Sequence, residues 1–333
     1  MAYKLGILDQ SPIFPGKSAT DALQSTIHLA RKAEEWGYDR FWVSEHHQSA
    51  EVAGSSPEVL MSHLLAKTKS IKIGSGGVML QHYSPYKVVE DFHILSTLTP
   101  GRVELGIGKA PGGFSLSTKA LRYGSSGNDT DFNEKLTTLQ EFVHDSLRKD
   151  HPLYGANPLP RPKEVLPTFL LGASANSAKL AAELGMNFVF ARFLNGNDSI
   201  LDEAVKVYRD VHPKGNFIVA IALFTALSQE EAEKEAKNYK IFKIFLKSGR
   251  SVSVQSLEQV EAFREQTDES FEVKEQQVDM IAGNLDFIED ALDWLATAYQ
   301  IDEFILHTPI RNEEKRLKSF ELMSQLNVGV VNR

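Results

Sequence analysis

Short apolar runs alternate along this chain with longer stretches in which apolar residues recur every three or four positions. The short runs are typical of buried β-strands, and the longer stretches have the repeat of amphipathic α-helices. The runs predict strands at Lys4–Leu8, Arg40–Glu45, Ile71–Gly76, Arg102–Gly108, Thr168–Gly172, Asn187–Ala191, Phe217–Leu223 and Asp302–His307. The stretches predict helices near 19–36, 57–68, 85–98, 131–147, 175–185, 197–210, 229–247, 286–299 and 311–326.

Residues at the ends of the predicted helices support this division. Ser18 precedes the first helix, and Asn284 or Asp286 begins a late one. These residue types cap helix N-termini by accepting hydrogen bonds from free backbone amides. Gly37 and Gly185 stand where glycines end helices in a left-handed conformation. Residue types that begin and end helices therefore stand at the predicted ends of these helices.

Strands that alternate with helices form a parallel sheet, and eight such strands can close into a barrel. We therefore expect an α/β fold in which residues 1–333 form one domain, an eight-stranded parallel β/α (TIM) barrel. An open, doubly wound sheet is the alternative. Insertions are expected after strand 4, at the Gly- and Ser-rich residues 109–130, and after strand 7, at the polar residues 248–284. Connections of this length are usually lids or mobile insertions.

Composition narrows the possible functions. The formal net charge of −8 is spread along the 333 residues, which argues against nucleic acid because phosphate neutralisation needs a basic face. The chain has no cysteine, so disulfides, thiolate metal sites and a cysteine nucleophile are excluded. No apolar run reaches the roughly 18 residues of a membrane span, and the N-terminus lacks the apolar core of a signal peptide. We expect a cytoplasmic protein without a membrane segment.

The densest group of polar residues follows the second predicted strand, at Ser44-Glu45-His46-His47. Successive side chains of a strand point to opposite sides, so one histidine can face the barrel mouth while the other packs or caps. Histidine suits proton transfer because its pKa lies near neutrality. A metal site would need a third ligand, with Asp9 or Glu45 as the candidates, and no HExxH spacing supports one. Asp9 is otherwise a wall of the pocket or a turn residue before Pro12.

Three other strand ends carry small or charged residues. Glycines 74, 76 and 77 follow the third strand, where they permit unusual backbone angles and close approach of a flat ligand. Lys109 follows the fourth strand and places a cation at the barrel mouth. Ser174 to Ser177 lead directly from the fifth strand into a helix, whose free amides and hydroxyls favour an anion. The ordinary alternative is a helix cap by Ser174 or Asn176. Lys109 and this helix start, on adjacent strands, favour a phosphate.

Several of these residues lie in segments that carry a family resemblance. The segments are Arg40–Pro57 (RFWVSEHHQSAEVAGSSP), Ile73–Pro85 (IGSGGVMLQHYSP), Pro100–Gly112 (PGRVELGIGKAPG), Leu170–Gly185 (LLGASANSAKLAAELG) and Ile281–Gln325. Their sequence and order resemble the bacterial luciferase-like flavin monooxygenase family, in the subset of luciferase-family oxidoreductases. The segments cover most of the chain. Together they are specific for this family, although no single segment is.

The resemblance implies a β/α barrel that binds FMN at its mouth, with an insertion after a late strand. His46 matches the family's catalytic histidine near the flavin C4a position. Gly76 and Gly77 match a pair joined by a non-prolyl cis peptide bond under the flavin ring. The residues that match the FMN phosphate site are Lys109, Ser174 and Ser177, with the amides of Ala175 and Asn176 nearby.

The chain departs from the family pattern at three places. Lys109 stands where arginine is usual, which keeps the positive charge but loses a bidentate fork. Gln81 replaces a common proline, and Arg192-Phe193 stand where close relatives have serine and histidine. These differences bear on substrate choice and flavin affinity.

The implied function is that of a two-component monooxygenase. A separate flavin reductase would supply reduced FMN (FMNH2), oxygen would add to give a flavin C4a-hydroperoxide, and a small organic substrate would be oxidised. The protein is expected to be a homo-oligomer such as a dimer. The alternatives are a deazaflavin-dependent dehydrogenase on the same barrel, a non-catalytic flavin-binding protein and a metal-dependent hydrolase. No metal is expected.

Overall fold

The computed structural model describes residues 3–124, 130–249, 251–254 and 256–327. The strands are β1 (Lys4–Asp9), β2 (Arg40–Val43), β3 (Lys72–Ser75), β4 (Val78–Met79), β5 (Val103–Gly108), β6 (Thr168–Gly172), β7 (Asn187–Ala191), β8 (Phe217–Thr225), β9 (Lys240–Leu246), β10 (Ser251–Val254), β11 (Phe271–Gln277), β12 (Ile281–Gly283) and β13 (Glu303–His307). The helices are α1 (Ala19–Glu35), α2 (Pro57–Lys67), η1 (Leu80–His82), α3 (Pro85–Leu98), α4 (Ser115–Leu121), α5 (Phe132–His144), α6 (Ala175–Glu183), α7 (Asp198–Val211), α8 (Gln229–Ala236), α9 (Leu257–Arg264), α10 (Leu285–Tyr299), α11 (Glu313–Met323) and η2 (Ser324–Asn327).

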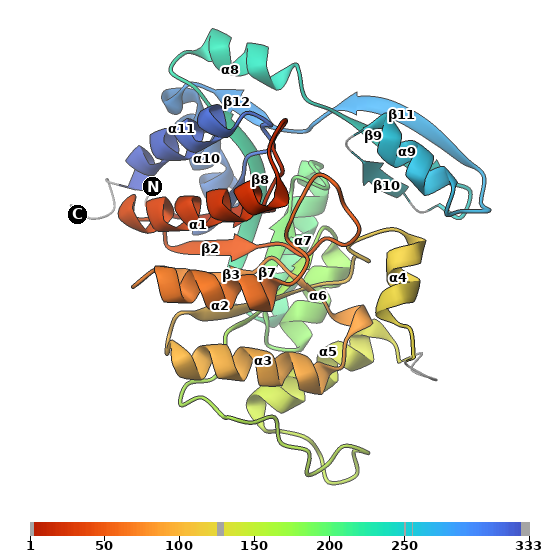
Figure 1. Ribbon diagram of the computed structural model, residues 1–333. Helices are drawn as coiled ribbons and strands as arrows, with labels where there is room; N and C mark the ends of the chain where they lie inside the picture. Colours follow the sequence, from red (N-terminus) through yellow and green to blue (C-terminus); the bar gives the residue numbers. More distant parts are fainter. Residues whose placement is uncertain (1–2, 125–129, 250, 255, 328–333) are drawn as a thin grey trace.

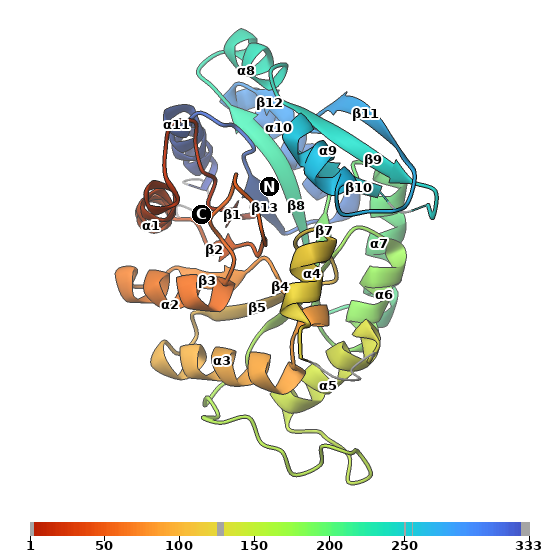
Figure 2. The ribbon, with the colours of Figure 1, turned by 45° about the vertical axis from the view of Figure 1, so that its right-hand side comes forward.

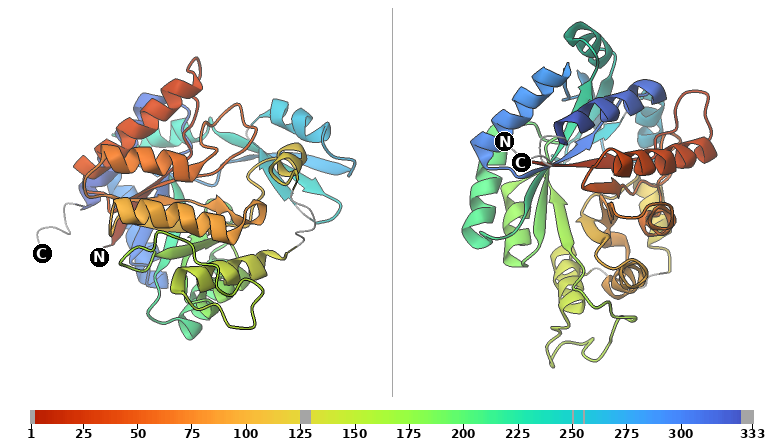
Figure 3. Two further views of the ribbon diagram at one scale, coloured as in Figure 1. Left: turned by 60° about the horizontal axis from the view of Figure 1, so that its bottom comes forward. Right: turned by 90° about the vertical axis from the view of Figure 1, so that its left-hand side faces the viewer.

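Within the described residues, eight parallel strands close into a barrel, as the sequence predicts. Their order is β1-β2-β3-β5-β6-β7-β8-β13, and β13 returns to pair with β1. The helices lie around these strands (Figures 1 and 2), and two further views show the same outer layer (Figure 3). No helix of the described chain is long and apolar enough to cross a membrane. The α/β barrel expectation is confirmed, and the open-sheet alternative is excluded by the closure.

Side chains fill the barrel on both sides of its wall. A large apolar cluster lies between the strands and the helices, as expected for parallel strands that are buried on both faces. A smaller cluster fills the interior, formed by Leu8, Trp42, Phe169, Val189, Ile218, Ala220 and Ile305. The barrel is therefore a packed core, and chemistry is restricted to its ends.

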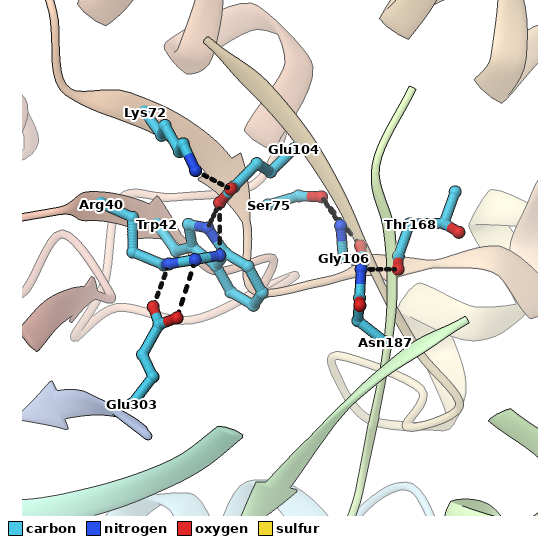
Figure 4. Close-up of polar contacts among 9 residues, drawn as sticks. All are labelled: Arg40, Trp42, Lys72, Ser75, Glu104, Gly106, Thr168, Asn187 and Glu303. Carbon is cyan, nitrogen blue, oxygen red and sulfur yellow. Dashed lines mark hydrogen bonds and ion pairs between the residues drawn. The ribbon is translucent and has the colours of Figure 1, made fainter. Parts of the chain in front are cut away.

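A buried ionic cluster occupies the N-terminal end of the barrel (Figure 4). Arg40 Nη1 lies 2.9 Å from Glu104 Oε2, and Arg40 Nη2 donates to Glu303 Oε2 over 2.9 Å. Burial raises the pKa of Glu303 to about 7, against the opposing effect of Arg40. Gly6 makes room for this arrangement, because a Cβ there would collide with Arg40 Cγ.

The ends of α1, α6 and α10 carry the capping residues that the sequence predicts. Ser18 forms a capping box with Asp21, and Asn284 accepts from Phe287 N at the start of α10. Gly37 and Gly185 have φ values of +80° and +67°, which suits glycine after a helix.

The predicted helix over 229–247 is wrong in its second half. Helix α8 ends at Ala236, and residues 240–246 form β9, which pairs with β10 and β11 in an antiparallel sheet. Apolar residues at 241, 242, 244 and 245 also fit a helical repeat, so the local pattern is ambiguous. Pairing with β10 and β11 decides for a strand.

The two expected insertions both contain regular structure. The one after β5 contains α4, and residues 125–129 of it lie outside the described chain. The one after β8 contains β9 to β11 and α9, beginning earlier than the expected 248. Strand β12, at the end of the expected range 248–284, belongs to the barrel side, because it pairs with β8. We call the segment 240–277 the insertion. Figures 1 and 2 show it beside α4.

Contacts join the insertion to the residues that follow β5. Phe114 packs against Phe263 with ring centroids 5.5 Å apart. The side-chain Oε1 of Gln266 accepts from Leu116 N over 3.0 Å, and its backbone oxygen accepts from Ser115 Oγ over 2.8 Å. The insertion is therefore held at the C-terminal end of β5, beside the barrel mouth.

Candidate active site at the barrel mouth

His46 lies just beyond the end of β2, at the C-terminal end of the barrel. Its Nδ1 is 3.1 Å from the hydroxyl of Ser44, which orients the ring. Burial, together with the neighbouring His47, lowers the pKa of His46 to about 4. The imidazole is consequently neutral at neutral pH and can donate or accept a proton.

His47 packs into a separate polar cluster and has different partners from His46. Strand β2 ends at Val43, before both histidines, so the predicted alternation of strand side chains does not apply to them. Its Nε2 is 2.7 Å from Glu45 Oε1, and Tyr83 donates to the same oxygen over 2.7 Å. The other oxygen of Glu45 accepts from Met79 N over 3.0 Å. Glu45 is buried and therefore ties the end of β2 to the segment after the glycines.

The peptide bond between Gly76 and Gly77 is cis, as the resemblance implies. A Cβ on Gly77 would lie 2.8 Å from the backbone of Gly106, and one on Gly76 would lie 2.5 Å from Leu8 Cδ1. The Gly77 position therefore has no room for a side chain, because it would meet backbone, whereas at Gly76 the end of the flexible Leu8 side chain would have to shift. Ser75 supports the turn, because its hydroxyl donates to Gly106 O over 2.8 Å and accepts from Gly106 N over 3.0 Å.

The proposed phosphate residues lie at the ends of two paired strands, β5 and β6. Ser174 is the N-cap of α6, where its side chain accepts from Ser177 N. The hydroxyls of Ser174 and Ser177 are 2.9 Å apart, and the Ser177 hydroxyl also donates to Ser174 O. Ala175 and Asn176 form the first turn of α6. The cap interpretation is thus correct for Ser174, and it leaves the helix N-terminus facing the strand ends.

Lys109 carries the positive charge of this region. Its side chain is exposed, with Nζ 5.5 Å from the centre of the Phe132 ring. It follows β5 directly, next to the strand that leads into α6. The structure therefore places a cation, two hydroxyls and a helix N-terminus on neighbouring strand ends.

Asp9 forms a buried ion pair with Arg316. Its Oδ1 lies 2.9 Å from Arg316 Nη2 and accepts from Ser11 N over 3.2 Å. The turn interpretation therefore describes Asp9 better than the pocket-wall interpretation. Among the residues that the structure describes, no group of three or more His, Cys, Asp or Glu side chains could hold a metal ion.

His307, at the end of β13, was not among the predicted site residues. Its pKa is lowered to about 4, mainly by burial and then by Arg316, and His46 contributes through its charge. Its ring lies 5.6 Å from that of Phe193, which follows β7. The sequence does contain a signal for this position. His307 is the last residue of a predicted barrel strand, and His46 directly follows another predicted strand.

Arg192, one of the departures from the family pattern, is bound to Asp198 through Nη2 at 3.2 Å. Its neighbour Phe193 packs against the interior cluster of the barrel. The pair thus contributes an apolar ring to the mouth beside His307.

Comparisons with known proteins agree with this architecture. The family model "Luciferase-like monooxygenase" matches residues 3–306. The N-acetyl-S-alkylcysteine monooxygenase of Bacillus subtilis is 46% identical over 325 residues, covering 96% of this chain and 97% of that protein. A luciferase-like monooxygenase of Escherichia coli is 32% identical over 95% of this chain and 94% of that protein.

Solved structures show the same fold. The apo form of MsnO8 superposes with a TM-score of 0.77 at 29% identity, covering 97% of this chain and 98% of that one. The oxygenating constituent of 3,6-diketocamphane monooxygenase from Pseudomonas putida, solved with FMN, gives a TM-score of 0.70 at 18% identity, covering 98% and 97%. The closed barrel, the strand-end residues and the match over residues 3–306 lead to one conclusion: this chain is an enzyme of the luciferase-like monooxygenase family.

Proposed function

We propose that this protein is the oxygenating component of a two-component system that uses reduced FMN and O2 to oxidise a small organic molecule. The observation that carries the proposal is the set of groups on the ends of β5 and β6. Lys109, two serine hydroxyls and the N-terminus of α6 form a donor set suited to a phosphate dianion.

The residues around these groups also fit the ring of FMN. Gly76 and Gly77 leave a backbone surface without side chains at the end of β3. Leu8 and Phe193 belong to the apolar interior that a flavin ring would cover. We assign the phosphate to Lys109 and Ser174–Ser177, and the ring to the side of the glycine pair.

Bound reduced FMN supplies the electrons that activate O2. The protein's own residues bind the flavin, orient the substrate and supply a proton. The hydroxyl of Ser44, 3.1 Å from Nδ1, holds the neutral ring of His46; in the tautomer in which Ser44 donates to Nδ1, the proton is carried on Nε2, from which it can be donated. The insertion, fixed to Leu116 by Gln266, limits the access of water to the mouth. One oxygen atom enters the substrate, and the other leaves as water.

For the substrate we propose an N-acylated S-alkyl cysteine. The support is the 46% identity to a Bacillus subtilis enzyme named for such compounds, over nearly the full length of both chains. A separate flavin reductase and a cytoplasmic location remain predictions. The homodimer also remains a prediction. Most apolar residues of α2 and α3 cover the barrel, although Val59 and Leu98 are exposed.

The test is an anaerobic titration with FMNH2, followed by mixing with ¹⁸O2 and N-acetyl-S-benzylcysteine. We expect saturable binding and one ¹⁸O atom in the product by mass spectrometry. His46→Ala should lower product yield without changing FMNH2 affinity. Binding without labelled product would leave a flavin-binding role, and binding of a deazaflavin instead of FMN would favour the dehydrogenase alternative.

A further inference from the structure

The loops that carry the proposed flavin site meet around one buried carboxylate. Glu45 follows the end of β2 and directly precedes His46. Its Oε2 accepts from Met79 N over 3.0 Å. Its Oε1 lies 2.7 Å from His47 Nε2 and accepts from the Tyr83 hydroxyl over 2.7 Å. A single side chain thus has partners in the loop after β2 and in the segment that follows the third strand of the barrel.

The contact with Met79 fixes the segment after the glycine pair. Met79 is buried, ends the short strand β4 and stands two positions after Gly77. Gly76 and Gly77 have no side chains that could pack against the barrel, so their segment has to be held through its backbone. A buried backbone N–H needs a hydrogen-bond acceptor, and Glu45 supplies one for Met79. The carboxylate therefore holds the backbone surface that we assign to the flavin ring.

The contact with His47 extends to the loop after β5. The backbone N of His47 donates to Gly112 O over 2.7 Å. Gly112 has a φ of +68°, and a Cβ there would lie 3.2 Å from both His47 Cδ2 and Met79 Cγ. The loops after β2 and β4 consequently both pack against this glycine. Lys109 lies three positions earlier in the same loop, so His47 helps to fix the loop that carries the proposed phosphate cation.

We propose that Glu45 is a positioning residue of the flavin site. Its carboxylate fixes the segment after the glycine pair through Met79 N, and it fixes the loop of Lys109 through His47. The inference deepens the proposed function and rests on it for the identity of the ligand. Glu45 acts through backbone groups and needs no contact with the flavin. Its loss should loosen two segments that bind different parts of FMN, whereas loss of Lys109 affects the phosphate alone.

Hydrogen–deuterium exchange tests the positioning in the flavin-free protein. Glu45→Met keeps the approximate size of the side chain and removes both acceptor oxygens. Exchange should become faster in segments 77–79 and 109–113, because amides exchange when their local structure opens. Glu34→Met is the matched control. Glu34 also accepts from backbone amides, those of residues 69, 70 and 71, at the opposite end of the barrel. Its loss should accelerate exchange there and leave the mouth unchanged.

Titrations with riboflavin and FMN separate the two contacts of Glu45. Riboflavin has no phosphate, so it reports on the ring alone. Glu45→Met should raise the dissociation constant of riboflavin roughly tenfold, the scale expected when a buried amide loses its acceptor, and that of FMN by more. His47→Leu should weaken FMN and leave riboflavin nearly unchanged. Glu45→Gln keeps an amide oxygen for Met79 N and should restore most of the affinity for riboflavin.

The outcomes are distinct. The proposal is wrong if Glu45→Met leaves exchange in the two segments unchanged, if it accelerates exchange in every barrel strand, or if Glu45→Gln binds riboflavin as weakly as Glu45→Met. His47→Leu tests the proposal even if Glu45→Met does not fold: exchange should be faster in segment 109–113, and unchanged exchange there would contradict the role of His47. Faster exchange in both segments without flavin binding by the original protein would reject the proposed function and keep the positioning of the loops.

Discussion

The indole Nε1 of Trp42 donates a 2.7 Å hydrogen bond to Glu104 Oε2. The same carboxylate oxygen receives Nη1 of Arg40. The opposite edge of Trp42 lies under Gly76, since a Cβ there would be 3.4 Å from Trp42 Cε3. One side chain therefore connects the ionic cluster at the base of the barrel with the glycine pair at its mouth. The base of the barrel is part of the support of the proposed flavin site.

Removing Arg40 should destabilise the fold strongly. Arg40→Met leaves Glu104 and Glu303 buried without their cation, which typically costs about 3–5 kcal/mol of unfolding free energy. Urea unfolding measures the loss. Lys206→Met removes an exposed ion pair with Asp202 and should change the unfolding free energy by less than about 1 kcal/mol. Equal effects of the two substitutions would contradict a structural role of the cluster.

The mouth histidines should make stability depend on mildly acidic pH. The pKa values of His46 and His307 are lowered to about 4 in the folded protein from 6.5. The unfolded chain therefore binds more protons between these values, and stability falls as pH drops from about 6.5 towards 4. Thermal unfolding from pH 7.5 to 4.5 should show the decline.

Two variants assign that pH dependence. His307→Phe should flatten part of the decline, because its proton uptake on unfolding disappears. Glu303 acts in the opposite direction, since its raised pKa of about 7 favours the folded state at lower pH. Glu303→Gln should therefore make the acid decline steeper. A profile unchanged in both variants would show that other groups dominate.

Lys109 should contribute to FMN affinity through its charge. Lys109→Ala should raise the dissociation constant of FMN about tenfold, as expected for loss of a charged hydrogen bond to phosphate. Riboflavin, which lacks the phosphate, should bind the variant and the original protein alike. Lys119→Ala, an exposed lysine on the nearby α4, is the control. Fluorescence titration measures both, and equal weakening of riboflavin would refute the phosphate assignment.

The contact between the insertion and α4 should govern the exposure of the mouth. Phe263→Ala removes the packing of Phe263 on Phe114 and on Phe271. Amides of β9 and β11 should then exchange faster with deuterium, while those of the barrel strands stay unchanged. Gln276→Ala, at an exposed position in β11, should leave exchange as it was. Uniform acceleration through the whole chain would indicate global destabilisation instead.

The sequence alone determined the barrel, and it pointed to the strand ends as the place of the proposed site. Buried strands and amphipathic helices have different repeats, so their alternation is visible without any partner. The rule that active sites lie at the C-terminal ends of barrel strands directed attention to the run Ser44–His47, the glycines after the third predicted strand and Lys109. The family resemblance then singled out His46 and the pair Gly76-Gly77.

Only the tertiary structure decided what depends on distant partners. Residues 240–246 fit both a helix and a strand until β10 and β11 pair with them. Asp9 lies 307 positions from Arg316 in sequence, so its buried ion pair could not be inferred locally. The contacts around Glu45 likewise form where loops from separate strands meet. Local pattern is a property of neighbours along the chain, whereas ion pairs and contacts between loops arise from the closure of the barrel, which brings β13 back beside β1.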